Sequence, residues 1–97
     1  MHVVVTYDVN TETREGRRRL RRIAKICEDY GQRVQLSVFE CAVDEMRLDA
    51  MLAALEKEIH PEQDSLRVYR LHGSRAGAVR TLGRDTYRDF SSDTLII

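Results

Sequence analysis

Two helix-type patterns of apolar residues alternate with strand-like runs, and this order constrains the fold more than any other feature of the chain. The first pattern lies between about Arg14 and Tyr30, with apolar residues at i, i+3, i+4 and i+7: Leu20, Ile23, Ala24 and Cys27. The second follows Asp44 with one further residue at i+11: Leu48, Met51, Leu52, Leu55 and Ile59. This spacing is typical of amphipathic helices. Gly31 is placed to end the first helix, Asp44 to cap the second and Pro61 to close it.

Strand-like runs stand before, between and after these two segments. The first, His2–Tyr7, is rich in β-branched residues and apolar at both parities, as expected of a central strand covered on both faces. The second, Val34–Val43, is either one bent strand or two short strands that turn near Leu36-Ser37, and the third is Ser65–Leu71. The order β-α-β-(β)-α-β predicts the α+β class, with a ferredoxin-like fold whose two helices cover one face of an antiparallel four-stranded sheet.

The other face of the predicted sheet has no cover within one chain. The chain has 97 residues, which is one domain by length. A single chain this short buries only about 60–65% of its unfolded surface. On the uncovered face His2, Val4 and Thr6 or their neighbours would lie bare together with Phe39 and Tyr69. We therefore expect a homodimer in which a second copy packs sheet to sheet.

The last part of the chain is too short for another domain. We divide the sequence into a ferredoxin-like domain at residues 1–82 and a C-terminal tail at residues 83–97. Two pieces near or within this tail are strand-like, Ala78–Leu82 and Thr94–Ile97. An apolar strand left free is an aggregation hazard. We expect the two pieces to pair with a sheet edge, in the same subunit or in its partner.

Arginine dominates the first predicted helix. The segment from Arg14 to Lys25 holds seven basic residues and one acid, a local balance of +6 in a chain with no net charge. A charged helix face is usually only solvated, but an arginine-rich face favours phosphate contacts because guanidinium groups bind phosphate in a bidentate way. The candidate nucleic-acid-binding residues of this segment are Arg14, Arg17, Arg18, Arg19, Arg21, Arg22 and Lys25. The six aromatic residues are not clustered, so the backbone of duplex DNA or RNA is a better ligand than stacked bases.

Asp8 ends the first strand and precedes this basic helix. It is either a turn-forming residue or a metal ligand, since an acid beside a phosphate-binding surface is the minimum of a phosphodiester site. Mg²⁺ usually takes one or two carboxylates and keeps several waters, so one acid per chain makes a thin site. If a dimer axis passes near the strand ends, two copies of Asp8 can share one Mg²⁺ and act as the catalytic metal site. Tyr7 and Asn10 are candidates to orient it.

Composition argues against several other classes of site. His2, His60 and His72 have no metal-ligand spacing, and no CxxC pair is present. Cys27 and Cys41 suit small buried residues in a reducing cytoplasm better than a disulfide framework. No signal-like or membrane-spanning stretch is visible, so we expect a cytoplasmic protein without a membrane partner. The acidic stretch at residues 40–64 opposes the basic helix and predicts one acidic and one basic side.

Two segments also carry a family likeness. Val5-Thr6-Tyr7-Asp8-Val9, then the arginine-rich helix, then Tyr30-Gly31-Gln32-Arg33-Val34-Gln35-Leu36-Ser37-Val38-Phe39-Glu40 closely resemble CRISPR-associated protein 2. This family is the small dimeric partner of the CRISPR integrase in spacer acquisition. The likeness spans roughly residues 1–82, and its most specific parts are the Tyr-Asp strand end and the Val-Gln-x-Ser-Val-Phe-Glu segment.

The resemblance implies a ferredoxin-like homodimer whose C-terminal strand joins the partner's sheet. It implies a Mg²⁺-dependent endonuclease of RNA or duplex DNA with Asp8 as the metal ligand, or a non-catalytic adaptor that bridges two CRISPR integrase dimers on a duplex. Arg19, Arg21, Arg33 and Phe39 match positions of family interest, and Arg33 thereby joins the candidate nucleic-acid-binding residues. A ferredoxin-like toxin ribonuclease is a further alternative, which the Ser-Val-Phe-Glu segment disfavours.

Overall fold

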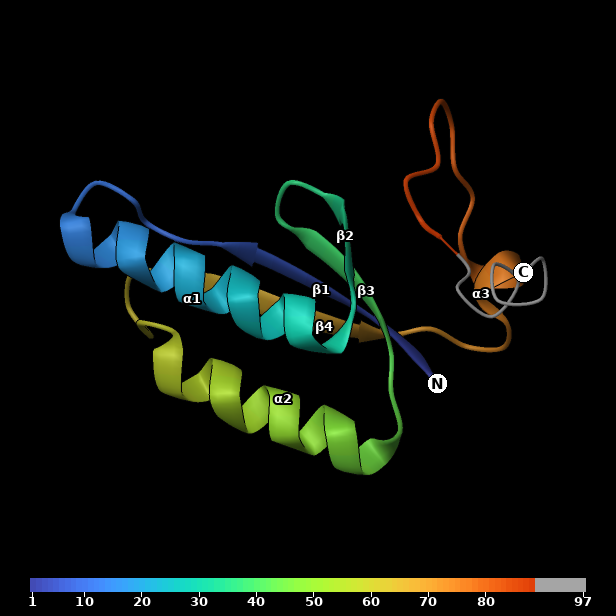
Figure 1. The fold of residues 1–97 in the computed structure, drawn as a ribbon, viewed down its shortest axis with the longest axis horizontal. Helices are drawn as coiled ribbons and strands as arrows, with labels where there is room; N and C mark the ends of the chain where they lie inside the picture. The colour runs from blue at the N-terminus through green and yellow to red at the C-terminus, as the bar shows by residue number, and fades with distance from the viewer. Residues whose placement is uncertain (89–97) are drawn as a thin grey trace.

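The computed structural model describes residues 1–88 of the chain. Strands and helices alternate as an α+β fold along the chain (Figure 1). The elements are β1 (His2–Asp8), α1 (Arg14–Tyr30), β2 (Gln32–Gln35), β3 (Val38–Ala42), α2 (Glu45–Glu58), β4 (Ser65–Arg70) and α3 (Arg75–Ala78). The second predicted strand is thus two short strands that turn at Leu36-Ser37. None of the helices in the described part is long and apolar enough to cross a membrane.

The four strands form one antiparallel sheet in the order β2-β3-β1-β4. β1 lies in the centre, where Val5 pairs with Phe39 of β3 on one side and with Val68 of β4 on the other. Asp8 pairs with Ser65 at the end of β1. This arrangement confirms the predicted ferredoxin-like fold with its antiparallel four-stranded sheet.

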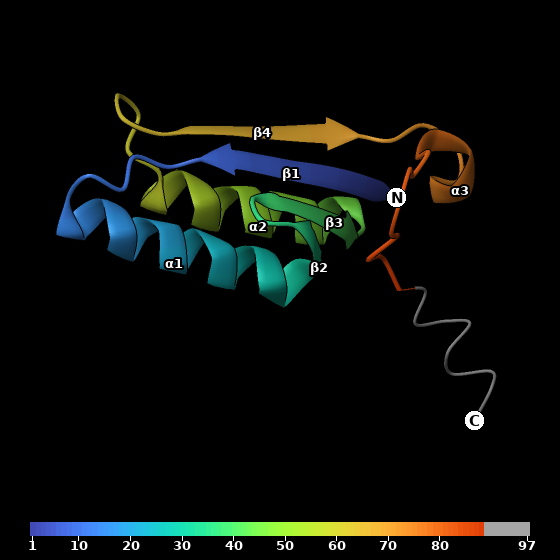
Figure 2. The ribbon, with the colours of Figure 1, turned by 90° about the horizontal axis from the view of Figure 1, so that it is seen from above.

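Helices α1 and α2 lie side by side against one face of the sheet, and within residues 1–88 neither of these two helices touches the other face (Figure 2). The side chains between the layers are buried and apolar, and include Val3, Val5, Tyr7, Ile23, Cys27, Leu48, Met51 and Leu55. Thr13 starts α1, because its hydroxyl accepts a hydrogen bond from the Gly16 N–H at 3.0 Å. The end of α1 requires Gly31, since a Cβ there would collide with Cys41 Sγ and the Glu40 carbonyl oxygen.

Phe39 was expected on the uncovered face of the sheet, and this prediction is wrong. Its ring is fully buried, and Phe39 lies opposite Val5, so both side chains point toward the helices. The other residues predicted on the open face were placed correctly. Val4 and Thr6 are half-buried on the open face, where Tyr69 is 46% exposed. Phe39 therefore belongs to the core rather than to a bare surface.

The predicted strand at Ala78–Leu82 is also wrong. Arg75–Ala78 form the short helix α3, whose start is stabilised by Ser74 Oγ accepting from the Gly77 N–H at 3.1 Å, and residues 79–82 have no regular secondary structure. Thr94–Ile97 lies outside the described residues. Local capping at Ser74 thus prevails over the strand-like composition that follows it.

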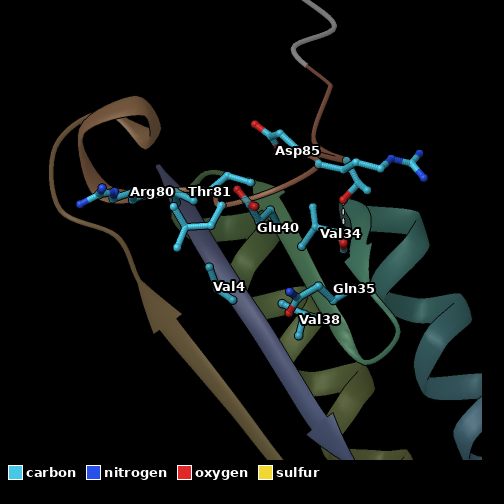
Figure 3. A pocket seen from close by; sticks show the side chains of 12 residues that line it. Val4, Val34, Gln35, Val38, Glu40, Arg80, Thr81 and Asp85 are labelled. Carbon is cyan, nitrogen blue, oxygen red and sulfur yellow. Dashed lines mark hydrogen bonds between the residues drawn. The ribbon is translucent and has the colours of Figure 1, made fainter.

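The chain after α3 returns to the β2 edge of its own sheet. Thr86 Oγ1 donates to the Val34 carbonyl at 2.6 Å, and the Gln32 side chain bonds the backbone of Arg88 through both its amide nitrogen and its oxygen. A nearly buried ion pair between Arg75 and Glu40, with an Nε–Oε1 distance of 2.6 Å, anchors the segment. Between the segment and the sheet lies a hollow of about 290 Å³ with Val4 and Val38 on its floor (Figure 3).

Candidate functional site

Asp8 lies on the open face of the sheet, where β1 emerges at the edge of the fold. Alternation along β1 places it on the same face as Thr6, and its side chain is exposed. A surface hollow of about 330 Å³ surrounds it, lined by Thr6, Tyr7, Asp8, Ser65, Arg67 and Tyr69. The segment that returns to β2 covers another part of this face, and within residues 1–88 the Asp8 end stays open. The carboxylate is therefore accessible to a ligand.

Tyr7, predicted to orient Asp8, faces the opposite side of the sheet. It is buried among the helices and stacks on Phe39, with ring centroids 6.2 Å apart. Burial raises the pKa of the Tyr7 phenol above its ordinary value, although the nearby Arg33 lowers it. The phenol is thus a neutral core group and not a neighbour of the Asp8 carboxylate.

Asn10, the other residue predicted to orient Asp8, uses its side chain in a local turn. Its Oδ1 accepts a hydrogen bond from the Glu12 N–H at 2.9 Å, as Asn does in turns that precede a helix. Its backbone N–H donates to Asp64 Oδ1 at 3.0 Å. Asn10 thus holds the loop after β1 in place and is not directed toward the Asp8 carboxylate.

Asp64 is a structural residue that the sequence did not indicate. Its side chain has no exposed surface, and it accepts from Arg19 Nε at 2.8 Å, from the His60 N–H at 2.9 Å and from the Asn10 N–H. Burial alone would raise the pKa of Asp64, but these hydrogen bonds outweigh it and hold the pKa below its ordinary value. Asp64 ties α1 to the loops that flank β1 and β4.

The residues present in one chain fit part of a Mg²⁺ site that two chains would share. The exposed Asp8 carboxylate has no hydrogen bond or ion pair with another residue of 1–88. The Asp64 carboxylate, in contrast, is fully engaged by donors. Residues 1–88 contain no group of three or more His, Cys, Asp or Glu side chains that could hold a metal. Because Mg²⁺ needs only one or two carboxylates, a second Asp8 from another copy would complete an ordinary ligand set.

The basic residues of α1 differ in whether their side chains pair with other residues of the described part. Arg14, Arg18 and Arg21 are exposed, and none of their guanidinium groups forms a hydrogen bond or ion pair with another described residue. The others have partners: Arg17 bonds the Thr11 carbonyl at 3.3 Å, Arg22 lies 3.8 Å from Glu58, Lys25 pairs with Asp29 at 2.8 Å, and Arg19 is held by Asp64. Only 15% of the Arg19 side chain is exposed, so its guanidinium is a structural group in this fold.

The free arginines of α1 and Asp8 face opposite sides of the molecule. α1 packs on the sheet through Ile23, Ala24 and Cys27, so Arg18 on the opposite arc points away from the sheet. Alternation along β1 places Asp8 on the sheet face opposite to α1 and α2. The acid and the basic helix are neighbours in sequence, but they do not form one continuous surface within a chain.

Arg33 and Phe39, the residues matched through the family likeness, form a stacked pair. The Arg33 guanidinium carbon lies 5.2 Å from the centroid of the Phe39 ring, and its Nη2 lies 3.9 Å from Glu28. Arg33 is exposed and can still reach a phosphate, whereas the Phe39 ring is fully buried. Phe39 therefore supports Arg33 and the core rather than a ligand.

The sheet, its two covering helices and the exposed strand-end acid define a small α+β protein of the ferredoxin-like type. The model of the family described as CRISPR associated protein Cas2 matches residues 1–79. The chain therefore belongs to the Cas2 family, as its sequence resemblance suggested.

Known relatives agree with this assignment over most of their length. The chain is 54% identical over 97 residues, the full length of both proteins, to the CRISPR-associated endoribonuclease Cas2 of Chlorobaculum tepidum. It is 48% identical over 83 residues, 86% of each protein, to the CRISPR-associated endonuclease Cas2 of Halalkalibacterium halodurans. The crystal structure of Streptococcus pyogenes Cas2 at pH 6.5 superposes with a TM-score of 0.76 at 52% identity, covering 86% of this chain and 100% of that one.

Proposed function

We propose that this protein is a spacer-acquisition component of a prokaryotic CRISPR system that works in the cytoplasm as a homodimer and hydrolyses phosphodiester bonds of nucleic acid. The observation that supports it is the exposed carboxylate of Asp8, which has no side-chain partner among residues 1–88 and lies on the sheet face opposite to α1 and α2. Relatives named as an endoribonuclease and an endonuclease support this activity. Membership of the Cas2 family favours it over a toxin ribonuclease.

We propose a dimer because the open face of one chain lacks a second metal-binding acid and a cover for its exposed side chains. Among residues 1–88, Asp8 is the acid that lines this hollow, and Tyr69 leaves 46% of its surface exposed beside it. A second copy packed on this face covers the exposed ring and brings its own Asp8, which completes the ligand set. Two Asp8 carboxylates with oxygens within about 4–5 Å of each other can share one ion, given Mg–O distances near 2.1 Å.

The chemistry divides between the metal and the residues of the chain. Mg²⁺, when bound, polarises a phosphate oxygen and lowers the pKa of a coordinated water. Asp8 binds the cation and fixes its position at the end of β1. The Asn10 and Asp64 hydrogen bonds hold the following loop, so the carboxylate stays at the mouth of the hollow.

Replacing Asp8 by Asn tests this proposal. The Asp8→Asn protein should lose Mg²⁺-dependent cleavage of labelled duplex DNA and of labelled RNA, yet remain a dimer in light scattering. Asp49→Asn, which removes an exposed carboxylate on α2, is the matched control and should cleave like the wild type. Unchanged cleavage by Asp8→Asn would exclude the metal site.

A second candidate function is a non-catalytic adaptor that bridges two integrase dimers on a duplex. Arg14, Arg18 and Arg21 favour it, because these unpaired cations point away from Asp8 and can bind a phosphate backbone without a metal. Each phosphate contact adds about 0.9 to the slope of log affinity against log salt on duplex DNA. Reversing the charge at Arg18 and Arg21 should therefore weaken duplex binding and flatten its salt dependence.

The tail provides the second test of the adaptor. Deleting Thr94–Ile97 should reduce binding to the integrase dimers and leave duplex binding intact, since the free arginines lie on α1. Spacer acquisition that survives both the charge reversals and this deletion would contradict the adaptor function.

A further inference from the structure

Arg67 shares the hollow around Asp8, and no sequence pattern pointed to it. On β4 it pairs with Thr6 of β1, while Asp8 pairs with Ser65, so Arg67 and Asp8 are diagonal neighbours of an antiparallel pair. Alternation along the two strands places Thr6, Asp8, Ser65 and Arg67 on the same open face. Diagonal neighbours of this kind lie about 7–8 Å apart.

The Arg67 guanidinium is oriented but not neutralised. Its Nη1 donates to the Tyr69 hydroxyl at 3.0 Å, and no carboxylate of residues 1–88 forms an ion pair with it. Both side chains are exposed on β4. The guanidinium thus keeps most of its five N–H donors free beside an acid with which it forms no ion pair.

Arg70 on the same strand is an arginine with a structural role, and it serves as a comparison for Arg67. Its side chain points to the opposite face of the sheet from that of Arg67. It pairs with Val3 of β1 on the face that carries the helices. Two of its nitrogens bond the Glu45 carboxylate, Nη1 at 2.7 Å and Nη2 at 3.3 Å. One strand therefore presents a paired arginine on one face and an unneutralised arginine on the other.

We infer that Arg67 is a catalytic residue that binds the scissile phosphodiester between itself and the cation held by Asp8. This inference rests on the proposed nuclease function and deepens it. A planar guanidinium binds two phosphate oxygens at once and stabilises the charge that develops there. Asp8 and Arg67 line the same hollow, and the bond to the Tyr69 hydroxyl holds the guanidinium there.

The test compares Arg67→Ala with Arg70→Ala on labelled duplex DNA and on labelled single-stranded RNA in Mg²⁺. Arg67→Ala should lower kcat/KM about a hundredfold, the usual effect of removing one donor to a developing oxyanion. Added guanidinium ions should restore part of its activity, which a purely structural defect would not allow. Arg70→Ala should keep kcat/KM near the wild-type value.

Three further measurements decide between this role and its alternatives. Arg67→Ala should melt within a few degrees of the wild type and remain a dimer, because within residues 1–88 its guanidinium bonds only the Tyr69 hydroxyl. Loss of the dimer would assign Arg67 to the interface and overturn the inference, as would unchanged cleavage or absent guanidinium rescue. If Asp8→Asn abolishes cleavage while Arg67→Ala does not alter it, only this inference fails; if Asp8→Asn cleaves normally, the proposed function itself fails.

Discussion

Arg19 is part of the basic run of α1, yet the structure predicts that replacing it will damage the fold more than nucleic-acid binding. Its guanidinium bonds the fully buried Asp64 carboxylate through Nε at 2.8 Å and Nη2 at 3.3 Å. Methionine keeps the apolar stem in place and removes only the charged donors. Arg19→Met therefore isolates the contribution of the ion pair to stability.

The size of the stability loss in Arg19→Met depends on the hydrogen-bond donors that Asp64 keeps. Hydrogen bonds to a charged group contribute about 1.5–3 kcal/mol, and removing one partner of a buried pair costs about 3–5 kcal/mol. Asp64 keeps the backbone N–H groups of Asn10 and His60 as donors, so the lower range applies. We expect a loss of about 2–3 kcal/mol in the free energy of unfolding, which lowers the Tm of a domain this size by roughly 10–20 °C.

Arg18→Met is the matched control, since Arg18 is exposed on the same helix and has no partner among residues 1–88. It should change the free energy of unfolding by less than about 0.5 kcal/mol. Urea titrations at one protein concentration measure both variants, and fluorescence anisotropy measures their duplex affinity. Arg18→Met should weaken duplex binding. If Arg19→Met unfolds like Arg18→Met and loses as much affinity, Arg19 is a phosphate contact and our reasoning is wrong.

Three more outcomes follow from buried groups. The folded state lowers the pKa of the Asp64 carboxyl below its ordinary value of 3.8, so the charged carboxylate stabilises the fold. As the pH falls below 3.8 and then through the lowered pKa, protonation removes this charge and the free energy of unfolding should fall. Asp64→Asn should lose this part of the pH dependence in urea titrations. Burial raises the pKa of the Cys27 thiol to about 12 and that of Cys41 to about 11, so both should resist a disulfide reagent at pH 8 until the chain unfolds, and rapid labelling would contradict their burial. Glu40→Gln should speed tryptic cleavage of residues 79–88, because it weakens the bond to Arg75 that anchors them; an unchanged cleavage rate would show that other contacts hold the segment.

The helices and the order of elements along the chain were predictable because apolar spacing reports burial directly. The face of Phe39 was not, because alternation shows which residues of a strand share a face but not which face the helices cover. That face follows only from the register of β3 with β1, in which Phe39 pairs with the buried Val5.

The site was predictable only in part, for a related reason. Asp8 was found because a strand end exposes its last residue. The role of Arg19 depends on Asp64, which lies 45 residues away in the sequence, and no local pattern records such a contact. Arg67 could have been noticed from the alternation of Ser65, Arg67 and Tyr69 on β4, but its position beside Asp8 needed the register of β1 with β4.

In the proposed dimer each chain supplies half of a metal site, and mixing of subunits tests this arrangement. Wild-type and Asp8→Asn chains are co-expressed at varied ratios, purified as dimers, and assayed for Mg²⁺-dependent cleavage. If both carboxylates hold one ion, activity should fall with the square of the wild-type fraction, because a mixed dimer has an incomplete site. Activity that falls in direct proportion to the wild-type fraction would show that each chain works alone and would contradict the account.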